Sequence, residues 1–204
     1  MISVEMNIPK LNDVIGQLNK QNGEIQKALD RTANDCKNRA PAQITKAVTT
    51  VYAIKSGDVA AAGKSAKLSA KTVGDIKVKN GHVSSIQLTY SGRRLTPLHF
   101  SMTPKVKPSD RKRYKVKATI FRGKKQTLQG KYDSPIFLAP TKQGIVLPFQ
   151  RVESDRRLPV YAIHTVSIPQ MIENEVVAQD IHERVEELFI KRLQHHVDRA
   201  VKNK

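Results

Sequence analysis

The sequence predicts an α+β fold in which helices at both ends of the chain flank a mostly antiparallel, twisted sheet of about five to seven strands. Apolar residues recur at three-and-four spacing in residues 9–51 and 168–200, which is typical of amphipathic helices. Between residues 76 and 121 they alternate with polar residues, which is typical of half-buried strands. The connections between these strands are short, as antiparallel pairing requires.

A chain of 204 residues with 39% hydrophobic residues suits a single domain with a modest core. We divide this predicted domain, residues 1–204, by the change in pattern along it. The parts are an N-terminal helical part (1–54), a linker or weak hairpin (55–75), a sheet part (76–166) and a C-terminal helix (167–204).

The N-terminal part predicts a helical pair. An apolar stripe runs from Leu11 to Ala40, interrupted at Gly23, and its expected use is core packing. Pro41 follows Ala40, and a residue before proline is disfavoured in helical geometry, so we expect the first helix to end there. Pro41 itself suits the first turn of a second helix. A helical hairpin and one kinked helix both remain open.

The central part begins with a small, polar and basic stretch, residues 55–75, which we expect to be a linker or weak hairpin. Asn80-Gly81 then predicts a tight turn between two strands. In residues 113–121, Val116 and Ala118 alternate with Lys115 and Lys117. This pattern predicts a strand with one buried face and one basic face.

The C-terminal part predicts one helix of about thirty residues. Ser167 and Gln170 have the spacing of a capping box, and Pro169 lies in the first turn, where its missing N–H is tolerated. Residues 168–190 carry six acids and one base, whereas residues 191–204 carry five bases and one acid. This polarity complements the helix dipole at both ends.

Charge is concentrated in one segment. The chain has a net charge of +18, and residues 91–131, with 13 basic side chains and one acidic, contribute +12 of it. Such a concentration favours contact with a polyanion or an acidic protein surface. A solvated face that keeps the protein in solution remains the alternative. The candidate contact residues are Arg93, Arg94, Lys105, Lys107, Arg111, Lys112, Arg113, Lys115, Lys117, Arg122, Lys124 and Lys125.

No pattern of catalytic, metal-binding or cofactor-binding residues is visible. His182 and Glu183 begin like a zinc-protease motif, but the second histidine is missing. His195 and His196 point about 100° apart on a helix, and we expect histidines of the surface or helix terminus. Cys36 lies on the helical stripe, where a buried structural thiol is expected. We therefore predict a non-enzymatic protein without cofactor or metal. No stretch reaches the roughly 20 apolar residues of a membrane span.

The segment from Gly144 to Met171 resembles the C-terminal signature of the phage minor tail protein Z family. That signature is a strand ending in Phe-x-Arg, a basic turn, Arg-Leu-Pro-Ile and a Pro-x-Met entry into a helix. Here His164-Thr165-Val166-Ser167 stands where the family commonly has Gly-Pro-Ser before the Pro-x-Met. The matching residues are Phe149, Arg151, Arg157, Leu158, Pro159, Pro169, Gln170 and Met171.

The resemblance implies a structural virion protein of a phage or prophage tail, assembled in the cytoplasm of the bacterial host. It implies completion of the head-proximal end of the tail for head joining and positioning of the DNA end. The implied partners are the tail terminator, the tail tube or the tape measure, further copies of the chain in a homo-oligomeric ring, and the DNA end. The alternative is a free-standing protein that binds nucleic acid without sequence preference through residues 91–131.

Overall fold

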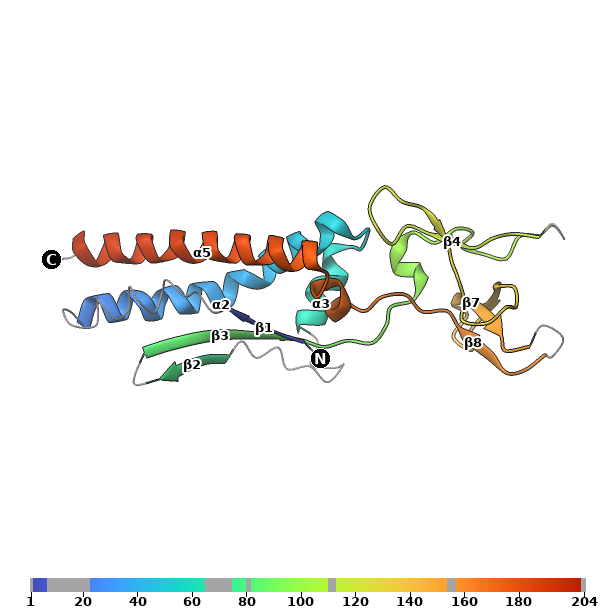
Figure 1. Ribbon diagram of the computed structural model, residues 1–204, viewed down its shortest axis with the longest axis horizontal. Coiled ribbons are helices and arrows are strands. Elements are labelled where there is room, and N and C mark those ends of the chain that lie inside the picture. The colour runs from blue at the N-terminus through green and yellow to red at the C-terminus, as the bar shows by residue number, and fades with distance from the viewer. Residues whose placement is uncertain are drawn as a thin grey trace.

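The computed structural model describes residues 2–6, 23–64, 75–79, 82–109, 113–153 and 157–202. These residues form an elongated molecule with two lobes, a helical lobe that contains both long helices and a smaller β lobe (Figure 1). The α+β class, the antiparallel pairing and the long C-terminal helix are confirmed.

Two long helices lie side by side in the helical lobe and run in opposite directions (Figure 1). They are α2 (Gly23–Val51) and α5 (Glu175–Lys202). Of the two alternatives left open, a hairpin and one kinked helix, the structure has one helix: α2 continues through Pro41, so the predicted helix end at Ala40 is wrong. A proline inside a helix loses one backbone hydrogen bond. Full burial of Ala40, Ile44 and Val48 around it stabilises the continuous helix. The predicted helical stretch in residues 9–22 lies outside the described residues.

A three-stranded sheet packs beside α2, in the order β1-β3-β2 and antiparallel throughout. The central strand, β3, pairs with β1 at the N-terminus of the chain. Residues 2–6 therefore lie beside residues 86–90. The predicted turn at Asn80-Gly81 falls outside the described residues, between the two strands that it was expected to join. The strands are β1 (Ile2–Met6), β2 (Asp75–Lys79) and β3 (His82–Tyr90).

The β lobe contains a two-stranded sheet, β4-β5, and a three-stranded sheet, β6-β7-β8. The predicted single sheet of five to seven strands is therefore wrong: the described strands form three small sheets. Gly123, Gly130, Pro135 and Gly144 lie between the strands of this lobe, where glycine favours turns and proline cannot donate to a ladder. The elements are η2 (Pro97–Phe100), β4 (Lys117–Ala118), β5 (Gln126–Thr127), β6 (Phe137–Pro140), β7 (Val146–Arg151) and β8 (Val160–Ala162).

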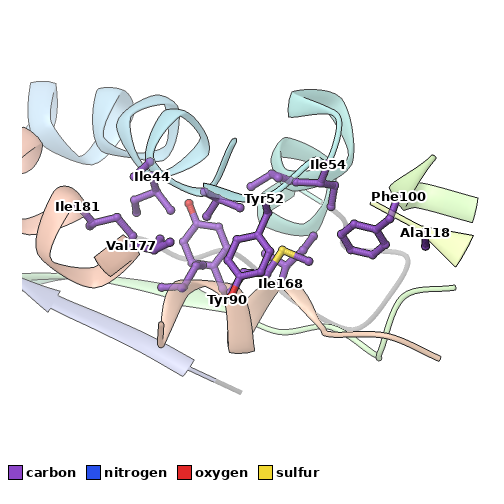
Figure 2. Close-up of a cluster of buried hydrophobic side chains, with 14 of the residues drawn as sticks. Ile44, Tyr52, Ile54, Tyr90, Phe100, Ala118, Ile168, Val177 and Ile181 are labelled. Atoms are coloured by element: carbon purple, nitrogen blue, oxygen red, sulfur yellow. The ribbon is translucent and has the colours of Figure 1, made fainter. Parts of the chain in front are cut away.

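The two lobes meet where α2 ends. Tyr52 forms a β-bridge with Phe121, and their rings lie 4.9 Å apart. Ala53 N donates to Ile120 O at 2.9 Å, and Arg122 N donates to Val51 O at 2.9 Å. A single buried cluster crosses this junction, from Ile44 and Tyr90 to Phe100 and Ala118 (Figure 2). The lobes therefore share one core.

A short helix, α3 (Ser56–Lys64), occupies the first part of the segment for which we expected a linker or weak hairpin. Val59 is fully buried in the shared core. Asp58 Oδ2 lies within hydrogen-bond distance of His99 Nδ1, at 3.0 Å. The helix therefore anchors the end of α2 to η2. Residues 65–74 lie outside the described part of the chain.

The predicted capping box is confirmed at α4 (Ile168–Ile172). Ser167 N donates to Gln170 Oε1 at 2.9 Å, and Gln170 N donates to Ser167 Oγ at 3.4 Å. The predicted single helix is nevertheless interrupted after α4, and α5 begins at Glu175. Asn174 Oδ1 accepts from Val177 N at 3.4 Å, so a second side-chain cap starts α5. Within the described residues, no helix is long and apolar enough to cross a membrane.

Candidate polyanion and partner-binding surface

The predicted alternation of basic and apolar residues holds around β4. Val116 and Ala118 are buried in the shared core, whereas Lys115 and Lys117 are exposed. Backbone hydrogen bonds hold this segment on both sides, with Thr103 N donating to Lys117 O and Leu128 N donating to Val116 O, each at 2.8 Å. The two lysines are therefore displayed on a strand whose opposite side is fixed by the core.

Two more exposed lysines lie next to the residues that pair with Lys117. Lys117 is paired with Thr103 on one flank and with Thr127 on the other. Paired residues share a face, and so do residues two positions apart in extended chain. Lys125, two positions before Thr127, follows this register and is exposed, and Lys105 is exposed in the bend that follows Thr103. We call Lys105, Lys115, Lys117 and Lys125 the basic face.

Arg122 links this surface to the lobe junction. Its Nε donates to Thr49 O, a carbonyl in the last turn of α2, where a cation is stabilised by the helix dipole. Beside it lies a pocket of about 660 Å³, whose cationic lining residues are Lys55, Lys105 and Arg122. No aspartate or glutamate is among its described lining residues. The pocket can therefore accept an anionic group without like-charge repulsion.

The remaining predicted contact residues are also exposed where the structure describes them. Arg93 and Arg94 lie in the connection from β3 to η2. Arg111 and Lys112 lie outside the described residues. Lys107, Arg113 and Lys124 are exposed in the loops on either side of β4.

Part of the family signature forms an internal contact. The guanidinium of Arg151 lies over the ring of Phe137, 4.8 Å from its centroid, and the Phe149 ring lies 6.3 Å from that of Phe137. Met171 and Pro169 are buried where α4 meets the core. Arg157, Leu158 and Pro159 are instead exposed in the loop before β8, and Gln170 is the exposed partner of the capping box.

Sequence reasoning missed Gln150, which the signature contains between Phe149 and Arg151. Only 2% of Gln150 is exposed, and its Nε2 donates to Ser134 O at 2.6 Å and to Tyr132 O. Its Oε1 accepts from Tyr132 N at 3.0 Å. Gly130 passes so close that a Cβ there would lie 1.9 Å from Gln150 Oε1. A glycine beside a predicted strand was the available signal for this close approach.

Two of the groups considered for chemistry, Cys36 on α2 and His196 on α5, are buried. Cys36 is buried, and burial, followed by the Asp35 carboxylate, raises the pKa of its thiol to about 11. We expected a histidine of the surface or of the helix C-terminus. His196 lies in the C-terminal part of α5 but not on the surface: only 8% of it is exposed, and its Nε2 lies 3.1 Å from Asp35 Oδ2. Among the described residues, no three His, Cys, Asp or Glu side chains gather so as to hold a metal ion.

Comparison with known proteins gives one family. A family model described as prophage minor tail protein Z matches residues 8–204, nearly the whole chain. No curated protein and no solved structure matches the chain.

Proposed function

Because the chain belongs to the prophage minor tail protein Z family, we propose that it completes the head-proximal end of the tail and prepares it for head joining. Family membership itself makes the chain a structural protein of a phage tail, in contact with other tail components. The proposal adds a non-enzymatic role late in tail assembly. It also adds a homo-oligomeric ring and the positioning of the DNA end.

The basic face is the observation that supports this role. Its four lysines are exposed on or beside the short ladder around β4, which the core holds in place, and Arg122 and Lys55 lie at the adjacent pocket. A cationic surface of this kind attracts DNA phosphates or an acidic neighbouring protein without reading base sequence. Both are expected neighbours where a tail meets a DNA-filled head.

The experiment is a complementation assay in a phage or prophage whose copy of this gene is deleted. We expect heads and tails to accumulate separately, and the intact gene to restore joined particles seen by electron microscopy. Lys115→Glu with Lys117→Glu should lower the yield of joined particles at least tenfold, because the reversed charge repels an anionic partner. Lys142→Glu, exposed in the turn between β6 and β7, is the matched control and should retain joining. Normal joining without the gene would refute the proposal.

The concentration of charge in residues 91–131 also favours the alternative, a free-standing nucleic-acid-binding protein. Such a protein would lose roughly 10³-fold or more in DNA affinity between 50 and 200 mM salt. It would also be missing from purified particles. Detection of the chain in the particle, together with weak or no DNA binding by the isolated protein, would exclude this alternative.

A further inference from the structure

The outward side of α5 carries an acidic stripe with exposed aliphatic residues at its ends. Val176 is 65% exposed and Ile190 is 56% exposed. Between them, Glu183 and Glu187 are exposed, at spacings that place all four residues on one side of a helix. We call Val176, Glu183, Glu187 and Ile190 the acidic stripe.

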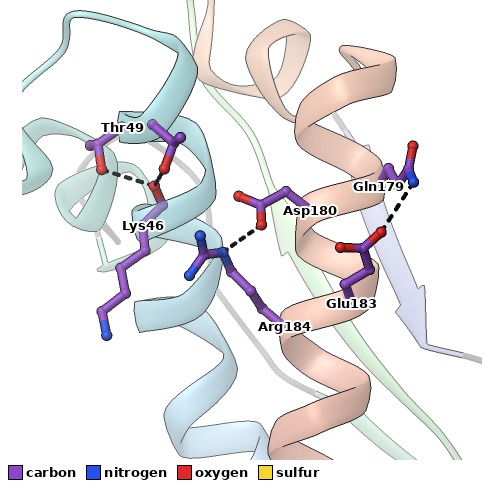
Figure 3. Close-up of polar contacts among 7 residues, drawn as sticks. Lys46, Thr49, Gln179, Asp180, Glu183 and Arg184 are labelled. Carbon is purple, nitrogen blue, oxygen red and sulfur yellow. Dashed lines mark hydrogen bonds and ion pairs between the residues drawn. The ribbon is translucent and has the colours of Figure 1, made fainter.

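The charges of this stripe are not neutralised within the described part of the chain. Glu183 Oε1 accepts from Gln179 Nε2 at 3.1 Å, a neutral partner, whereas Asp180 has its own cation, Arg184, at 2.7 Å (Figure 3). No described cation pairs with Glu183 or Glu187. The opposite side of α5 is occupied, because Val177, Ile181 and Val185 are buried in the core. The stripe is therefore an unpartnered face of a helix that is otherwise fixed.

We propose that the acidic stripe binds the basic face of a second copy of this chain. The two surfaces are opposite in charge, and each is held on an element anchored in the core. They cannot meet within one molecule, since α5 runs away from the β lobe that carries the basic face (Figure 1).

The contact is heterologous, because different surfaces of the two copies meet. Repeated contacts of this type close into a ring or continue as a filament. This inference rests on the proposed homo-oligomeric role and specifies the surfaces that would build it. The stripe spans 15 residues, with about 21 Å along the helix axis between the first and the last. One helix face of this length offers less area than the roughly 800 Å² per partner of a standard interface. Association of isolated chains should therefore be weak and sensitive to salt.

A charge-swap experiment on the full chain tests the pairing. We expect wild-type protein to associate at low salt in sedimentation velocity and native mass spectrometry. Glu183→Lys with Glu187→Lys should weaken association at least tenfold, and so should Lys115→Glu with Lys117→Glu. A chain with all four substitutions should regain association to within about threefold, because both surfaces are then reversed together. Asp133→Lys and Lys142→Glu are charge controls on other exposed sites and should change little.

Circular dichroism first confirms that each variant is folded. A wild-type chain that stays monomeric at every concentration would overturn the inference. So would a quadruple variant that fails to recover association. Unchanged association in both double variants would also overturn it, by placing the interface elsewhere. None of these results decides the tail role, which the head-joining assay tests separately. Recovery of head joining by the quadruple variant would further show that the partner of the basic face is protein rather than DNA, because the charge of DNA cannot be reversed.

Discussion

At the residue scale, Gly130 is the position where a single methyl group has the most predictable effect. Gly130→Ala would place a Cβ 1.9 Å from Gln150 Oε1, so the buried glutamine must leave its three hydrogen bonds to residues 132 and 134. We expect a loss of about 1–3 kcal/mol in the free energy of unfolding, the cost of leaving buried polar groups unsatisfied. Thermal and urea unfolding followed by circular dichroism measure it.

The matched control is Gly57→Ala in α3. Nothing lies within 4 Å of a Cβ at that position, so only the helix propensity changes. This substitution should stabilise the protein by about 0.4–1 kcal/mol. Equal stability of the two alanine variants would show that Gln150 is not held as described.

At the element scale, the capping box at Ser167 is the local signal that predicts most about the C-terminal helices. Ser167→Ala removes the hydroxyl that accepts from Gln170 N, and should destabilise the protein by roughly 0.5–2 kcal/mol. Ser167→Thr keeps the hydroxyl and should recover most of the loss. Chemical denaturation of the three proteins measures the difference, and an alanine variant as stable as wild type would contradict the cap's contribution.

The same elements show why local signals could be predicted and long-range pairing could not. The capping box joins residues three positions apart, and the alternation at Lys115–Ala118 is a property of one strand, so both were visible in the sequence. The division into three sheets depends on pairs such as Ile2 with Tyr90, which no local pattern indicates. The continuation of α2 through Pro41 likewise depends on tertiary burial, which outweighs the propensity of a single residue.

The candidate surface could be predicted in the same partial way. Composition indicated the basic segment, and strand periodicity indicated that Lys115 and Lys117 face outward. The grouping of Lys125 with them follows from the pairing of Lys117 with Thr127, and that of Lys105 from the bridge between Lys117 and Thr103, and only the fold establishes these pairs. The sequence therefore predicted which lysines are exposed, whereas which of them lie side by side depends on how the strands pair.

At the scale of the whole molecule, the junction at Tyr52 determines whether the two lobes unfold together. Tyr52 is 3% exposed, contacts the Phe121 ring and lies within the backbone bridge between α2 and the β4 segment. A shared core normally makes opening cooperative, whereas a weakened junction allows one part to open alone. The β lobe has short strands and small sheets, so it should be the part that opens first.

We therefore predict that Tyr52→Ala separates the stabilities of the lobes. Removing a large buried aromatic costs about 3–5 kcal/mol, so amide exchange in residues 113–151 should accelerate by at least about two orders of magnitude. Exchange in α2 and α5 should accelerate less, because their mutual packing remains. Hydrogen exchange with mass spectrometry resolves the two sets of peptides. Tyr161→Ala, at a position that is 51% exposed on β8, is the matched control and should leave both sets nearly unchanged. Equal acceleration in both lobes would instead show that the molecule unfolds as one unit even without the tyrosine.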